Sequence, residues 1–210
     1  MAIVIALIVY FYFFSLRKKK IPRTNSLYTD ALNAMVNGNL SNAIGLLKQV
    51  VKQDSNHVRA YLQLGNILRK ENPEQALKIH QSLTVRPNLP KEIQVDIHTA
   101  LAEDYRFISN YKKAIEEAKL VLAIEKRNLW ALNFLINISV ENQDWEEAIR
   151  WTKQHQKITG KTTSEDEAKF DVFKGLDYFK SGDFEKAKSQ FEKGIKASPD
   201  FPPSYRYLGD

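Results

Sequence analysis

The chain repeats one pattern of polar and apolar positions along its length. A polar turn is followed by an aromatic residue or Leu, or in one copy by Pro, and then by Ala three positions later. The five copies read NGNLSNA (37–43), KENPEQA (70–76), ISNYKKA (108–114), NQDWEEA (142–148) and SGDFEKA (181–187). Successive alanines are separated by 33, 38, 34 and 39 residues. A regular spacing near 34 residues predicts a stack of similar structural units.

Small residues at fixed positions indicate that each unit is a pair of closely packed antiparallel helices. A period near 34, with a turn followed by Ala, is typical of tetratricopeptide repeats. We therefore predict an all-α fold in which residues 24–210 form a right-handed α-solenoid of about five repeats and the start of a sixth. The five units cover approximately 24–57, 58–91, 95–128, 129–162 and 168–201. The small position of the first helix is occupied by Ala31, Gly65, Ala102, Ile136 and Gly175.

The units differ in how well they fit this pattern. The fifth fits best, with Gly175, Tyr178 and Phe191 at the expected positions. The fourth fits least well, because Ile136 and Ser139 replace the usual small and aromatic residues. We expect all five units to form helix pairs in the same register.

The two longest spacings predict lengthened loops between repeats. The extra residues fall in RPNLPKE (86–92) and TGKTTSEDE (159–167), which are rich in turn-forming and polar residues. After Phe201 the segment PPSYRYLGD begins the first helix of a sixth unit. Because a solenoid needs a polar capping element at its end, we expect the natural protein to continue beyond Asp210.

Residues 1–16 carry no charged side chain and predict a transmembrane helix. As a helix they would span about 24 Å at ~1.5 Å per residue, slightly less than the ~30 Å apolar core of a bilayer. The nearby cations all follow the apolar run, at Arg17, Lys18, Lys19, Lys20 and Arg23. By the positive-inside rule the short N-terminus lies outside and the chain after Arg17 is cytoplasmic.

Two other interpretations of the N-terminal segment agree less well with its charges. A cleaved signal peptide needs cations before the apolar run and a small-residue cleavage site after it. A helix buried in a soluble core would need a polar face to present to solvent. Residues 17–23 are therefore interpreted as a basic cytoplasmic tether, which either contacts anionic lipid head groups or only sets the topology. Asn25 or Ser26 is available to cap the helix that follows.

The remainder of the chain is almost neutral. The formal net charge is +6, and residues 1–23 contribute +5 of it. Nucleic-acid binding would require a basic stripe on the folded part, and the sequence does not predict one.

The sequence contains no recognisable catalytic or metal-binding constellation. It has no cysteine, which excludes disulfides, thiolate catalysis and cysteine-bound zinc in these residues. Its histidines, His57, His80, His98 and His155, do not pair with one another or with a carboxylate at a metal-binding spacing. His80 is expected to pack or to hydrogen-bond between helices. We therefore predict that this segment is not an enzyme and holds no cofactor.

Recognition of another protein is the predicted activity of the repeats. In such arrays the first helix of each unit lines a concave groove, and the outward positions there are the candidate contacts. The candidates are Arg59, Asn66, Arg69, Lys70, Arg106, Trp130, Asn133 and Asn137, with Leu62, Thr99, Glu103 and Phe107 in the same register. Asn can bind a partner backbone in both senses and Arg can hold a carboxylate, while Trp130 suits a hot-spot anchor. Leu62 and Thr99 stand where a polar clamp would be needed, so binding of a C-terminal chaperone tail is not predicted.

The segment LGNILRKENPEQALKIHQSL (64–83) carries a family resemblance. Together with the apolar N-terminus and the basic tether, it resembles the lipopolysaccharide assembly protein B family of Gram-negative bacteria. ALKIHQSL (76–83) is the most specific part, and LAEDYRFISNYKKAIEEA (101–118) also agrees. The resemblance extends over essentially the whole chain.

The resemblance implies a single-pass protein of the bacterial inner membrane, with a periplasmic N-terminus and cytoplasmic repeats. In that family the repeats act as an adaptor between two enzymes. One is the deacetylase that commits precursor to lipid A synthesis, and the adaptor brings it to the other, a membrane-bound ATP-dependent protease. The family typically ends in a rubredoxin-like ribbon that holds zinc or iron through two CxxC pairs. This cysteine-free sequence does not contain the ribbon, which would have to lie beyond Asp210.

Two other functions remain open at this stage. One is a generic inner-membrane tetratricopeptide scaffold for another envelope assembly or secretion complex. The other is an enzyme whose catalytic domain follows Asp210. Sequence beyond that residue would separate them, because CxxC pairs favour the family and a catalytic domain favours the enzyme.

Overall fold

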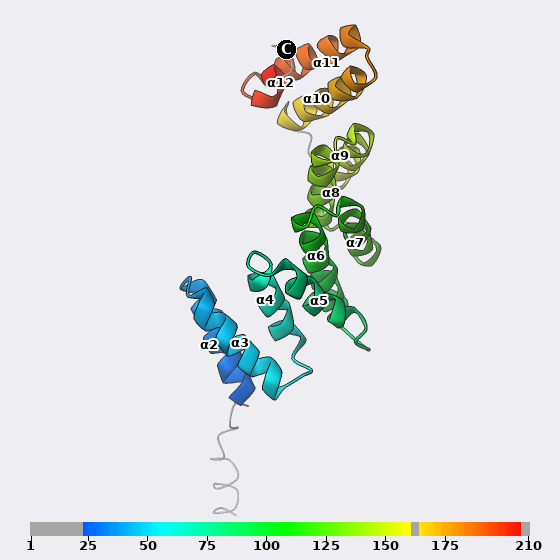
Figure 1. Ribbon diagram of the computed structural model, residues 1–210. Helices are drawn as coiled ribbons and strands as arrows, with labels where there is room; N and C mark the ends of the chain where they lie inside the picture. The colour runs from blue at the N-terminus through cyan, green and yellow to red at the C-terminus, as the bar shows by residue number, and fades with distance from the viewer. Residues whose placement is uncertain (1–22, 161–163, 207–210) are drawn as a thin grey trace, which may run out of the picture. The chain divides into compact units, whose positions relative to one another are not determined.

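A computed structural model describes residues 23–160 and 164–206, and the ordered elements in these ranges are all helices (Figure 1). They are α2 (Arg23–Val36), α3 (Leu40–Gln53), α4 (Val58–Leu68), α5 (Pro73–Thr84), α6 (Lys91–Phe107), α7 (Tyr111–Ile124), α8 (Leu129–Glu141), α9 (Trp145–Thr159), α10 (Ser164–Lys180), α11 (Phe184–Ala197) and α12 (Pro202–Arg206). The predicted all-α fold is confirmed over these ranges.

The predicted transmembrane helix, residues 1–16, lies outside the described residues, as do Arg17, Lys18, Lys19 and Lys20 of the tether. Among the helices that the structure does describe, none is both long and apolar enough to cross a membrane.

The chain divides into two compact units, residues 1–79 and 80–210, and each is described by itself. In the first unit α2 packs against α3, and α3 against α4. Its core includes the buried side chains of Ala31, Leu47 and Leu64. In the second unit α6 packs against α7, α8 against α9 and α10 against α11. This pairing of successive helices is the arrangement that the repeat pattern predicts.

The alanines of the repeat pattern lie in the helix-packing interfaces. Each occupies the second helix of its pair and is at most 1% exposed: Ala43, Ala76, Ala114, Ala148 and Ala187. A methyl side chain lets the paired backbones approach closely, so the period of the sequence is the period of these contacts.

The small position of the first helix is buried as well, and the fifth unit shows why it must be small. A Cβ atom built on Gly175 would lie 2.5 Å from Cε1 of Phe191, which projects from α11. In the fourth unit Ile136 and Ser139 are 4% and 1% exposed. The unit with the weakest pattern therefore keeps the predicted register with a larger residue at the contact.

An Asn or Asp directly precedes the second helix of every repeat and caps it. Its side-chain oxygen accepts a hydrogen bond from the backbone N–H three residues later, which satisfies one of the unpaired donors of the first turn. In chain order, the backbone N–H of Asn42 donates to Asn39, that of Gln75 to Asn72, that of Lys113 to Asn110, that of Glu147 to Asp144 and that of Lys186 to Asp183.

The residue before the cap adopts the left-handed conformation in four repeats. The φ angles are +72° at Gly38, +58° at Ser109, +56° at Gln143 and +81° at Gly182. Glycine adopts this conformation at little cost, whereas Ser and Gln pay for the crowding of their Cβ atoms. The turns of the third and fourth repeats are therefore strained relative to those of the first and fifth.

Two expectations need correction. Helix α2 spans Arg23–Val36, so Asn25 and Ser26 lie within the helix instead of capping it. Polar residues are tolerated there because the first N–H groups of a helix have no partner within it. Helix α10 begins at Ser164, so the loop predicted for residues 159–167 is shorter than expected.

The other predicted loop and the start of a sixth repeat agree with the structure. Helix α5 ends at Thr84 and α6 begins at Lys91, which leaves a connection close to the predicted 86–92. Helix α12 begins at Pro202, directly after Phe201.

Candidate protein-binding site

Helix α8 presents a polar face at the positions predicted for partner contacts. Trp130, Asn133 and Asn137 follow one another at spacings of three and four residues, which places them on one side of a helix. Asn133 and Asn137 are exposed, while Trp130 is half-buried with its ring 5.0 Å from that of Phe134. The two amides are therefore available to a partner, and Trp130 is partly accessible beside them. We call the outward side of α6, α8 and α10 the first-helix face.

Arg106 of α6 is engaged within the protein. Its Nε donates to Oε2 of Glu141 at 3.1 Å and its Nη2 to Oε1 of the same carboxylate, which joins α6 to α8. Its guanidinium lies 5.9 Å from the ring centre of Phe134. The hydrogen bond to Glu141 raises the pKa of Arg106 above its ordinary value. A partner carboxylate would have to compete with Glu141, so Arg106 primarily connects neighbouring repeats.

A cavity of about 450 Å³ adjoins Asn137 on the first-helix face. Its lining comes from α8, the start of α9, α10, α12 and the residue just before α12. The residues are Asn137, Val140, Trp145, Lys169, Val172, Phe173, Leu176, Phe201, Pro202 and Arg206. Apolar side chains form most of this surface, and Asn137, Lys169 and Arg206 add polar groups. Ligand sites typically combine an apolar lining with a few polar groups in this way.

The remaining candidates belong to the first unit. Arg59 and Asn66 lie on α4, Arg69 directly follows that helix, and Lys70 lies in the next turn. Arg59, Asn66 and Lys70 are exposed, and Arg69 donates from Nη2 to Oδ1 of Asn66 at 2.8 Å. Leu62, in the same predicted register, is only 4% exposed and belongs to the apolar interior.

His80 has the structural role predicted for it. It is 0% exposed, and its Nδ1 lies 2.5 Å from Oδ2 of Asp104, which is 1% exposed. The pair connects α5 to α6 inside the second unit. His98 pairs similarly with Glu117 at 2.7 Å, nearer the surface. Among the residues of known placement, no three His, Asp or Glu side chains gather as metal ligands would.

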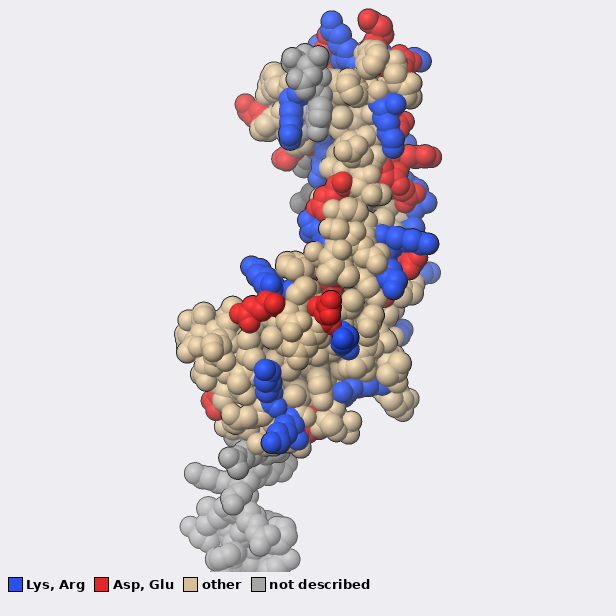
Figure 2. Space-filling model, viewed as in Figure 1, with Lys and Arg blue, Asp and Glu red and all other residues tan. Residues whose placement is uncertain are grey.

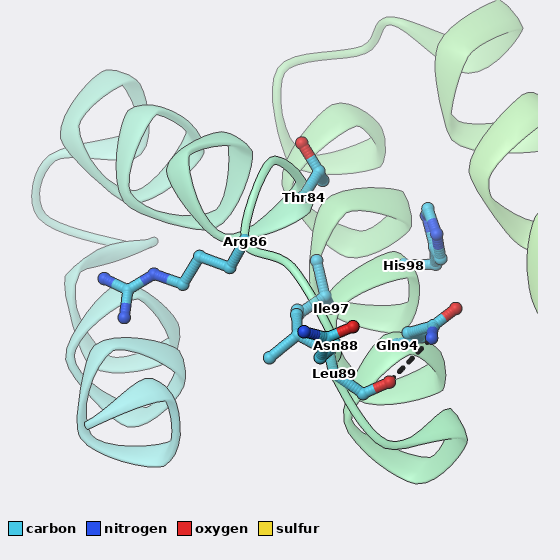
Figure 3. A pocket seen from close by; sticks show the side chains of 7 residues that line it. All are labelled: Thr84, Arg86, Asn88, Leu89, Gln94, Ile97 and His98. Carbon is cyan, nitrogen blue, oxygen red and sulfur yellow. Dashed lines mark hydrogen bonds between the residues drawn. The ribbon is translucent and has the colours of Figure 1, made fainter. Parts of the chain in front are cut away.

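A second cavity, of about 280 Å³, lies beside the loop between α5 and α6 (Figure 3). It is lined by Thr84, Arg86, Asn88, Leu89, Gln94, Ile97 and His98. Gln94 donates from Nε2 to the carbonyl oxygen of Leu89 at 2.8 Å, which ties the loop to α6. In Figure 3 the side chain of Arg86 extends away from the other six. The cavity therefore reflects how the loop is held, and we rank it below the larger one as a binding site.

Charged residues of both signs are interspersed on the face shown in Figure 2. Lys and Arg lie among Asp and Glu on this face, without a continuous stripe of one sign.

Two segments of the chain match family models described as tetratricopeptide repeat, residues 28–83 and 172–201. The chain contains tetratricopeptide repeats. It is also similar to lipopolysaccharide assembly protein B of Escherichia coli strain K12, with 25% identity over 171 residues. The aligned region covers 81% of this chain and 44% of that protein, so the chain spans less than half the length of the relatives it matches. The resemblance first seen in residues 64–83 is thereby confirmed.

Solved structures support the same fold. A structure of MamA has a TM-score of 0.65 at 20% identity and covers 89% of this chain and 97% of its own. YrrB, described as a TPR protein with an unusual peptide-binding site, has a TM-score of 0.66 at 15% identity. The alignment covers 93% of this chain and 95% of the YrrB chain. At these identities the likeness shows the fold alone.

Sequence reasoning missed most of the larger cavity, although the signal was present. Gly175 and Ile136 occupy the same position in the fifth and fourth repeats. When the two repeats are aligned on them, Lys169, Val172 and Leu176 stand at the positions of Trp130, Asn133 and Asn137. The predicted contacts stopped at the fourth repeat, so the equivalent residues of the fifth were not considered.

Proposed function

We propose that this protein is an adaptor, anchored in the bacterial inner membrane, whose repeats hold partner proteins on the first-helix face. The observation that carries the proposal is the arrangement of exposed Asn133 and Asn137 beside a largely apolar cavity of about 450 Å³. Such a surface suits recognition of a polypeptide, because the amides pair with backbone groups while the cavity takes up an apolar side chain.

The partners are proposed from the similarity to lipopolysaccharide assembly protein B. The adaptor would bind the deacetylase that commits precursor to lipid A synthesis. It would present this enzyme to a membrane-bound ATP-dependent protease. The similarity over 81% of the chain supports this assignment. The tetratricopeptide matches support a scaffold in preference to an enzyme.

The half-life of the deacetylase in cells tests this function. Depletion of the natural full-length protein should lengthen it, and the wild-type gene should restore it. A gene encoding Asn133→Arg and Asn137→Arg should fail to restore it, because both substitutions fill the first-helix face with bulky cations. Lys188→Arg, at an exposed position of α11, is the matched control and should restore it.

A half-life that does not respond to depletion would refute presentation to a protease. The generic inner-membrane scaffold would then be the better description. That alternative predicts that the Asn133 and Asn137 variant disturbs a different envelope complex while deacetylase turnover stays normal.

The proposed topology can be tested separately. Because the chain has no cysteine, single introduced cysteines can be labelled without background. Ala2→Cys should react with a membrane-impermeant maleimide added to spheroplasts, whereas Lys188→Cys should react only after lysis. Labelling of both positions in sealed spheroplasts would contradict a cytoplasmic location of the repeats.

A further inference from the structure

The larger cavity combines an apolar wall with two cationic side chains, Lys169 and Arg206. Val172, Phe173 and Leu176 of α10 are 2–7% exposed and contribute the apolar side. Lys169 lies on the same helix, and Arg206 belongs to α12. None of the described residues that line the cavity carries a carboxylate.

Lys169 and Arg206 differ from Arg106 in their ion pairing. Arg106 is held by Glu141, whereas neither Lys169 nor Arg206 forms an ion pair with any residue whose position is described. Two cations beside a largely apolar surface attract a ligand that is both acidic and apolar. Asn137 completes the lining with an amide that can donate to and accept from an extended backbone.

We propose that this cavity binds an acidic segment of a partner protein in extended form. One bulky apolar side chain of the segment, such as Leu or Phe, enters the space between α8, α10 and α12, and flanking carboxylates pair with Lys169 and Arg206. This inference rests on the adaptor function proposed above and specifies the kind of sequence that the adaptor recognises.

Three fluorescein-labelled peptides test this specificity by fluorescence anisotropy with the full chain in detergent micelles. The first has a Leu-Phe centre flanked by Glu on both sides. The second has the same centre flanked by Lys, and the third has a Ser-Ser centre flanked by Glu. Micelles without protein correct for peptide partition into detergent. The first peptide should bind roughly tenfold more tightly than either of the others, because each of them lacks one of the two kinds of contact.

A charge-reversal variant separates specific contacts from general attraction. Lys169→Glu combined with Arg206→Glu should lower the affinity for the Glu-flanked Leu-Phe peptide by roughly tenfold. The Lys-flanked peptide should then bind more tightly than the Glu-flanked one. Lys188→Glu combined with Lys196→Glu changes the net charge equally at exposed positions of α11. That control should preserve the order of the wild type.

A reversal of preference cannot arise from misfolding, since an unfolded variant would lose all binding. Equal binding of the Glu- and Lys-flanked peptides to the wild type would overturn the proposal. So would a charge-reversal variant that keeps the wild-type order. These outcomes are independent of the deacetylase half-life, so failure of the cavity assignment and failure of the adaptor function can be told apart.

Discussion

Replacement of Gly175 by Ala should destabilise the fifth repeat, although Ala is the better helix former. The added Cβ would lie 2.5, 2.7 and 3.1 Å from three ring carbons of Phe191. Favourable carbon–carbon contacts require about 3.5–4.0 Å. The ring is only 2% exposed and cannot turn into solvent. The helices α10 and α11 must therefore move apart, or the ring must leave its preferred rotamer.

Gly45 in α3 provides the matched control. It is an exposed position inside a helix, and a Cβ there meets no atom within 4 Å. Gly45→Ala should therefore gain about 1 kcal/mol of stability from helix propensity alone. Gly175→Ala gains the same term and loses about 1–3 kcal/mol to overpacking. The difference between the two substitutions isolates the packing cost.

Hydrogen exchange of the helix amides is the appropriate assay, because repeat arrays can unfold in parts. Amides of α10 and α11 should exchange faster in Gly175→Ala, and those of α3 should exchange more slowly in Gly45→Ala. Phe191→Leu in the Gly175→Ala background should recover part of the loss, which a double-mutant cycle would measure. If Gly175→Ala protected its helices as much as Gly45→Ala does, the register assigned to the fifth repeat would be wrong. Gly175→Leu should have a still larger effect than Ala.

The remaining predictions concern buried and strained groups. His80→Leu should lower the free energy of unfolding by about 1–3 kcal/mol, because it removes a hydrogen-bond partner of buried Asp104; an unchanged urea midpoint would contradict this. Gln143→Gly should raise stability by about 1 kcal/mol, because it removes the crowding of a Cβ atom at a φ of +56°. Gly182→Ala should lower stability, because it places a Cβ atom at a φ of +81°. Burial raises the pKa of Asp171 in the folded protein. The contribution of this residue to the free energy of unfolding is therefore greatest below the ordinary aspartate pKa of about 3.9. It falls as the pH rises through the higher pKa of the folded state. Asp171→Asn should therefore stabilise the protein at neutral pH and have little effect below pH ~3, and an equal gain at both pH values would refute this account.

The features that could be predicted from the sequence are those that depend on neighbours along the chain. Periodic alanines located the helix pairs, and all five proved buried. Glycine, Asn and Asp marked the turns, because a left-handed residue and a capping side chain act within a few positions. The boundaries were less certain, as the start of α10 at Ser164 shows, because polar residues suit a first helical turn as well as a loop.

The availability of each candidate contact was decided by residues distant in the sequence. Arg106 and Glu141 are 35 positions apart, so the ion pair that occupies Arg106 depends on how α6 stacks on α8. His80 and Asp104 come together across α5 and α6 for the same reason. A repeat pattern specifies which residues face a neighbouring helix, but not which side chains pair there.

The cavity next to Asn137 required the tertiary structure for its existence. Sequence determined that the chain folds as helix pairs and where their small contacts lie. Only tertiary packing brings α8, α10 and α12 together around one cavity, which Lys169 and Arg206 help to line. The physical reason is that helix periodicity is set by local backbone geometry. The volume between helices depends instead on the sizes of side chains contributed by several repeats at once.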